Sequence, residues 1–85
     1  MNYGEIIRKR IVDLCQQRGI STNKLASMCG IWQSTVESIL KGRSNNPKLK
    51  TLHKIANGLS MTVSEFLDFP ELNEYSFADM EEEED

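Results

Sequence analysis

The stretch from Ser21 to Gly42 constrains the fold more than any other part of the sequence, because one glycine divides it into two short amphipathic segments. The first predicts a helix over about 22–28, with the Ser21 hydroxyl as its N-cap. The second predicts a helix over about 33–40, in which apolar residues three and four apart share one face. Gly30 lies between them, where a tight turn requires a positive φ. The stretch therefore predicts two short helices that cross closely and leave a polar face outward.

The rest of the sequence up to residue 69 also has helical periodicity, without a strand pattern or an internal repeat. A first helix is expected over 3–18, and a fourth should begin near Pro47. The expected apolar stripe of the fourth helix is Leu49, Leu52, Ile55, Ala56 and Leu59. Thr62 to Glu65 has the form of a capping box and should begin a fifth helix, which Pro70 ends. The expected fold class is all-α, a compact five-helix bundle in a single domain.

The charges divide the chain into a basic and an acidic part. All ten Lys and Arg lie in residues 1–54 together with three acids, so this part carries +7. Residues 55–85 hold ten acids and no base, so they carry −10, and the total is −3. Such an asymmetry indicates a body that binds a polyanion and an acidic C-terminal extension. Arg8, Lys9 and Arg10 are expected to add only a long-range field.

The acidic extension from Glu71 onward differs in character from the body. Leu72, Tyr75 and Ala78 would share one face if a short sixth helix formed. Residues 81–85 are five consecutive acids, which repel one another. Two interpretations stay open: a solvated, partly disordered tail, or a segment that folds on a partner or competes for the basic surface.

Several function classes find no support in the sequence. Cys15 and Cys29 are spaced for neither zinc nor a redox motif, so they are expected to be buried, reduced thiols. His53 is the only histidine, so no metal site is expected. No nucleophile–base motif or glycine-rich phosphate loop indicates an enzyme, and no cofactor is expected. No apolar run is long enough to span a membrane and the N-terminus is not a signal peptide, which favours a cytoplasmic protein.

Ala26, Gly30, Val36 and Ile39 fit the pattern of a known DNA-binding motif. The sequence resembles the helix-turn-helix of the Cro and phage-repressor family, also called the XRE type, over about residues 5–69. A small residue at position 26 lets the second motif helix cross closely, and the glycine makes the turn. The resemblance implies a lambda-repressor-like fold, with a DNA-binding domain over 1–69 and an acidic tail over 70–85.

The resemblance also assigns residues by position, because in this family the second motif helix enters the major groove of double-stranded DNA. The residues placed at base contacts are Gln33, Ser34, Thr35 and Ser38. The residues placed at phosphate contacts are Thr22, Asn23, Lys24, Lys41, Arg43, Ser44 and Asn45. A glutamine can bond two atoms of an adenine edge, worth roughly 1–3 kcal/mol of discrimination.

Three features depart from the family pattern or limit it. Trp32 stands where a serine or threonine often caps the reading helix, and its side chain cannot accept an amide hydrogen bond. Its ring either stays exposed, for contact with DNA or a partner, or lies over neighbouring side chains. Cys15 and Leu40 stand where many family members have an arginine and a glutamate that form a buried salt bridge. Cys15 and Leu40 are therefore expected to be in contact. Glu37 would repel phosphate or accept from a cytosine amine.

The function expected from these features is a sequence-specific, double-stranded DNA-binding transcriptional regulator of the repressor type. A homodimer on a two-fold site is expected, since one reading helix contacts few bases. Its surface is expected in the region of the fourth and fifth helices and the tail, especially around Phe66, Phe69, Leu72 and Tyr75. Two alternatives stay open: a DNA-binding antitoxin whose C-terminal segment binds a toxin, and a protein-interaction module that kept the fold but lost DNA binding.

Overall fold

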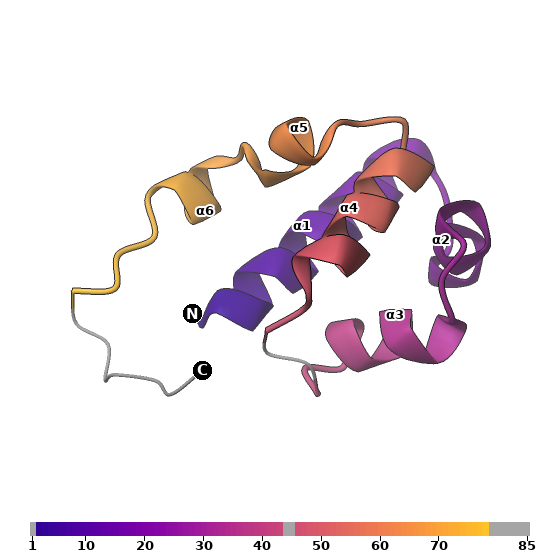
Figure 1. Cartoon of the computed structure of the whole chain (residues 1–85), viewed down its shortest axis with the longest axis horizontal. Coiled ribbons are helices and arrows are strands. Elements are labelled where there is room, and N and C mark those ends of the chain that lie inside the picture. Colours follow the sequence, from indigo (N-terminus) through magenta and orange to yellow (C-terminus); the bar gives the residue numbers. More distant parts are fainter. Residues whose placement is uncertain (1, 44–45, 79–85) are drawn as a thin grey trace.

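Six helices follow one another in the computed structural model, which describes residues 2–43 and 46–78 (Figure 1). They are α1 (Tyr3–Arg18), α2 (Thr22–Cys29), α3 (Gln33–Leu40), α4 (Leu49–Gly58), α5 (Val63–Leu67) and α6 (Pro70–Asn73). No strand occurs among the described residues. The all-α, five-helix fold class is confirmed, and the four-residue α6 is added to it.

Side chains and glycines end the helices where local sequence rules place them. The Ser21 hydroxyl accepts a hydrogen bond from the Lys24 amide at 3.1 Å, which confirms it as the N-cap of α2. Gly30 ends α2 with φ 65°, and its left-handed backbone makes the turn into α3. Thr62 and Glu65 exchange hydrogen bonds of 3.0 and 2.8 Å, so the expected capping box is present at α5.

The start of α4 differs from the expectation. Pro47 lies outside the helix, and the extended Lys48 precedes its first residue. Leu49, which the pattern assigned to the apolar stripe, is 63% exposed, whereas Leu52 and Ile55 are buried. The buried stripe therefore begins at Leu52, and no burial holds the chain helical as far back as Pro47.

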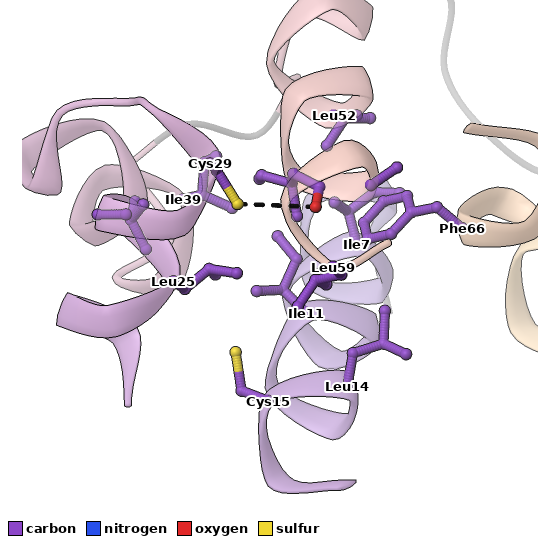
Figure 2. Close-up of a cluster of buried hydrophobic side chains, with 14 of the residues drawn as sticks. Ile7, Ile11, Leu14, Cys15, Leu25, Cys29, Ile39, Leu52, Leu59 and Phe66 are labelled. Atoms are coloured by element: carbon purple, nitrogen blue, oxygen red, sulfur yellow. Dashed lines mark hydrogen bonds between the residues drawn. The ribbon is translucent and has the colours of Figure 1, made fainter. Parts of the chain in front are cut away.

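The core is one cluster to which each of the first five helices contributes (Figure 2). Its most buried large side chains are Ile7, Ile11, Leu25, Val36, Ile55 and Phe66. Cys15 and Cys29 are buried free thiols, as expected, and burial raises the pKa of both. Leu40 packs against the same cluster. Its direct contact with Cys15 stays a prediction.

A glycine sets how closely α2 and α4 approach each other. A Cβ on Gly58 would overlap the Sγ of Cys29 and lie 2.9 Å from its Cα. The Cys29 Sγ also donates to the Ile55 carbonyl at 3.6 Å across the same contact, which Figure 2 marks with a dashed line. The close packing of α2 on α4, just before the turn from α2 into α3, therefore depends on the absence of a side chain at position 58.

The first part of the acidic extension packs against α1 through a few side chains, although most of its residues stay exposed. Pro70 does not end α5, which stops at Leu67, but opens α6 at its first turn. Glu71 forms an ion pair of 3.0 Å with Lys9. The Tyr75 and Tyr3 rings meet edge to face at 5.5 Å. Of the face expected for a sixth helix, only Leu72 lies within α6.

The basic residues of α1 make specific contacts, which corrects the expectation of a long-range field alone. Lys9 pairs with Glu71, and Arg10 donates to the Phe66 and Glu65 carbonyls, both at 2.9 Å. The Arg10 guanidinium also lies 4.9 Å from the centre of the Phe69 ring. These contacts bind α5 and α6 to α1. Residues 79–85, with their acidic run, lie outside the described residues, and the domain boundary at 69 stays a prediction.

Candidate nucleic-acid interface

Helix α3 lies along one edge of the fold (Figure 1). Val36 and Ile39 turn inward and are buried, which fixes the rotation of the helix. The predicted base-contacting residues lie on the remaining surface of the helix together with Glu37, and we call these four the reading face: Gln33, Ser34, Thr35 and Ser38. Gln33 and Ser34 are exposed, and Thr35 and Ser38 are half-buried. None is withdrawn into the core.

The side chain of Gln33 is held by hydrogen bonds from two directions. Its Nε2 donates to the Asn23 Oδ1 on α2 and to the Glu37 Oε1, at 3.3 Å, one turn further along α3. The Glu37 Oε2 lies 3.9 Å from the Lys41 Nζ. A chain of polar contacts thus joins the start of α2, the reading face and the end of α3. The structure brings together a predicted base reader, Gln33, and a predicted phosphate residue, Asn23.

These contacts determine what Gln33 can offer to a base. Both hydrogens of its amide point at acceptors of the protein, so its oxygen is the atom left for a ligand. Bidentate pairing with adenine needs the oxygen and one N–H together. Gln33 must therefore release either Asn23 or Glu37 to make that pair. The ion pair with Lys41 partly offsets the negative charge of Glu37, which the sequence predicts to repel phosphate.

The predicted phosphate residues lie at both ends of the reading face. Thr22, Asn23 and Lys24 occupy the first turn of α2, where Asn23 touches the N-terminal end of α3. Lys41 and Arg43 follow the C-terminal end of α3 and are exposed. Ser44 and Asn45 lie outside the described residues. Cations and polar groups therefore lie at both ends of α3, where the phosphate backbones on the two sides of a groove would pass.

Arg8 adds a cation that the sequence did not place at this surface. Its Nη1 lies 3.4 Å from where a Cβ of Gly42 would be, so the guanidinium rests against the residue that follows α3. Lys9 and Arg10 instead turn toward α6 and α5. Arg8 makes no hydrogen bond or ion pair with another described residue. Its place beside Lys41 and Arg43 makes it a further candidate for a phosphate contact.

Trp32 is the most exposed large apolar side chain among the described residues, at 81%. It occupies the N-cap of α3 with extended backbone angles and, as expected, makes no side-chain capping bond. Its carbonyl accepts from the Thr35 amide at 3.0 Å, so α3 begins at Gln33 without a shift. The ring stands out in solvent next to the reading face, and the alternative in which it lies over its neighbours is wrong.

The expected dimer surface is partly wrong. Phe66 is 0% and Phe69 is 7% exposed, because both complete the core under α1, so neither can meet a second chain. Leu72 and Tyr75 remain partly accessible, although they too pack against the core.

Neither a metal-binding cluster nor a membrane-spanning helix is found in residues 2–43 and 46–78. These residues hold no group of three or more His, Cys, Asp or Glu side chains that could bind a metal ion. The described helices include none that is both long and apolar enough to cross a membrane.

Helices α2 and α3, joined at Gly30 and presenting the reading face, form the helix-turn-helix of a DNA-binding protein. Residues 10–71 match the family model of the Cro/C1-type HTH DNA-binding domain, and the chain belongs to this family. The crystal structure of the prophage Lp1 protein 11 is similar, with 34% identity and a TM-score of 0.78. That match covers 88% of this chain and 100% of the other. No curated protein matched the sequence. The protein is a DNA-binding transcription regulator of helix-turn-helix type and not an enzyme.

Proposed function

We propose that the protein reads the sequence of double-stranded DNA by placing the reading face of α3 in the major groove, and that it acts as a repressor. The observation that carries this proposal is the orientation of Gln33 by Asn23 and Glu37 on an exposed helix. When Gln33 releases one of these two bonds to pair with a base, the other still holds the side chain, so less rotamer entropy is lost on binding.

In this proposal Gln33 supplies the main base contact and the serines add adaptable ones. Ser34 and Ser38 can each donate or accept, so they discriminate less than Gln33 does. Thr35 offers a methyl to thymine or a hydroxyl to phosphate. The first turn of α2 and the residues after α3 contact phosphates on the two sides of the groove, and the amides at the start of α2 favour an anion there.

We further propose that the regulator binds as a homodimer to a two-fold operator. One reading face carries only four polar side chains, which specify too few base pairs for a unique site. A two-fold pair would place two reading faces about 34–36 Å apart, one turn of B-DNA. The accessible parts of Leu72 and Tyr75 remain candidates for the surface between copies, and the acidic tail remains a candidate site for a protein partner.

The test compares two variants on an operator selected by the wild-type protein and on a scrambled duplex of the same composition. Gln33→Ala should weaken operator binding about 10-fold or more and leave the scrambled duplex unaffected, because only base reading is lost. Lys41→Ala should weaken both duplexes alike and lower the salt slope by about 0.9. Lys9→Ala is the matched control, since Lys9 pairs with Glu71 away from α3. Equal losses on both duplexes for Gln33→Ala would remove Gln33 as the reader.

A further inference from the structure

The exposed Trp32 makes no contribution to the fold that explains an indole at this position. Its side chain does not cap α3, and its ring makes no hydrogen bond, ring stacking or cation–π contact with another described residue. At 81% exposure it keeps most of an apolar surface in water, whereas tryptophan is on average a highly buried residue. A serine here would cap the helix and remove this exposed surface.

The position of Trp32 puts it between two parts of the proposed interface. It directly precedes Gln33, whose amide is bonded to Asn23 in the first turn of α2. The end of α3 that carries the indole therefore adjoins the helix start that is proposed to meet phosphates. An outward side chain at this junction lies at the margin of the reading face. In a complex with α3 in the major groove, this margin would face the sugar–phosphate backbone that borders the groove.

The chemistry of indole matches that of the DNA backbone. The ring has two apolar faces and one N–H, which can donate but not accept. The DNA backbone presents apolar deoxyribose carbons next to phosphate oxygens, which accept hydrogen bonds. A ring laid on a sugar with its Nε1–H toward a phosphate satisfies both halves of the side chain, and the contact carries no sequence information.

We infer that Trp32 is a DNA-contacting residue that packs its indole on a deoxyribose of the operator backbone and donates its Nε1–H to the adjacent phosphate. This inference rests on the proposed function, since it requires α3 to enter a duplex. It assigns to the margin of the interface an apolar contact that strengthens binding to every sequence alike.

The chain contains one tryptophan, so its emission reports this site alone. Adding the selected operator or the scrambled duplex should quench the emission and shift it to shorter wavelength, because the ring leaves water in both complexes. Anisotropy of a dye on the duplex measures binding in the same samples. The two signals should follow the same isotherm.

Two substitutions separate the ring from its N–H. Trp32→Ala should weaken both duplexes about 10-fold, equivalent to about 1.4 kcal/mol, and Trp32→Phe should lose only part of this. Phe77→Ala is the matched control, because Phe77 is 63% exposed but lies in the aromatic cluster with Tyr3 and Tyr75. All three variants should keep the thermal midpoint of the wild-type protein to within a few degrees, since neither side chain is in the core.

The outcomes distinguish this inference from the function on which it rests. If anisotropy shows binding while the emission stays constant, or if Trp32→Ala binds as the wild type does, the inference fails and DNA reading stands. A loss confined to the operator, and reproduced by replacing one thymine with uracil, would assign Trp32 to a base methyl and also overturn the sugar contact. If no duplex binds at all, both fail.

Discussion

The Nε2 of Gln33 donates to the Oε1 of Glu37 at 3.3 Å, one turn further along α3. The carboxylate thus orients the residue proposed to read a base, and it keeps a negative charge within reach of the duplex. The pairing of Glu37 with Lys41, at 3.9 Å between charged atoms, only partly offsets that charge because both side chains are substantially exposed. In the proposed complex with DNA, Glu37 would therefore combine a positioning role with a limit on nonspecific affinity.

Replacing Glu37 with glutamine should separate these two roles. Glu37→Gln keeps an amide oxygen that can accept from Gln33 but removes the charge. Affinity for any duplex should rise about fivefold at low salt, in line with about 1 kcal/mol for one charge near a phosphate in water. Sequence preference should stay the same.

Titrations with labelled operator and scrambled duplexes measure this effect, and Glu74→Gln removes one charge from the exposed C-terminal segment as the control. A change of preferred base at one position would show instead that Glu37 reads a cytosine amine.

The place of Arg8 against Gly42 predicts a phosphate contact from α1. Arg8→Gln should weaken binding to all duplexes and reduce the slope of log K against log salt by about 0.9, the value for one lost phosphate contact. Lys9→Gln removes the neighbouring charge, which points to Glu71, and should leave the slope unchanged. Equal slopes for the two variants would show that Arg8 acts only through the long-range electrostatic field and contacts no phosphate.

The close approach of α2 and α4 predicts that Gly58→Ala destabilises the fold. Alanine favours a helix by about 1 kcal/mol over glycine. Here its Cβ would overlap Cys29, and overpacking of this kind costs roughly 1–3 kcal/mol. The difference is a net loss of up to about 2 kcal/mol in the free energy of unfolding, which urea titration measures.

Asn57→Ala, at the exposed neighbouring position, should be neutral or slightly stabilising and serves as the control. An unfolding midpoint for Gly58→Ala at or above that of the wild type would mean that the two helices can separate at no cost.

The ion pair between Lys9 and Glu71 predicts that α6 responds to acid. The hydrogen bond from Lys9 lowers the pKa of the Glu71 carboxyl. The same bond with Glu71 raises the pKa of the Lys9 ammonium. The pair therefore contributes fully between the ordinary glutamate and lysine pKa values. Its contribution is lost as the pH falls through the lowered pKa of Glu71, or rises through the raised pKa of Lys9.

Chemical shifts of the Tyr3 and Tyr75 rings, which meet at 5.5 Å, should follow the loosening of α6 between pH 7 and pH 3. Glu71→Gln should start from the loosened shifts at neutral pH and change little on acidification, while Glu74→Gln should behave as the wild type. Shifts that titrate identically in Glu71→Gln would assign the change to another carboxyl.

The sequence predicts the helices well because their signals are local. Ser21, Gly30 and the Thr62 capping box each act on amides or carbonyls a few residues away, so their effect can be derived without the fold. The signal that orients α3 is equally local, because Val36 and Ile39 fix its buried side and leave the rest outward. Periodicity failed at Leu49, where an apolar residue at the right spacing lies beyond the edge of the core.

Contacts between distant segments could not be derived in this way. The bond between Gln33 and Asn23, the approach of Arg8 to Gly42 and the packing of Tyr75 on Tyr3 depend on how whole helices dock. Composition left open a solvated, partly disordered tail from residue 71, because acids dominate this segment. A few apolar side chains and one ion pair nevertheless hold its first residues on α1.

Base reading by α3 is tested most directly by selection of bound sequences from a random duplex pool, with the wild-type protein and with Gln33→Ala. Reading by α3 in a homodimer predicts an enriched two-fold sequence whose half-sites lie about one helical turn apart. One position in each half-site should lose its preference in the variant. Enrichment of no sequence by the wild type, or of the same sequence at every position by both proteins, would contradict reading by α3.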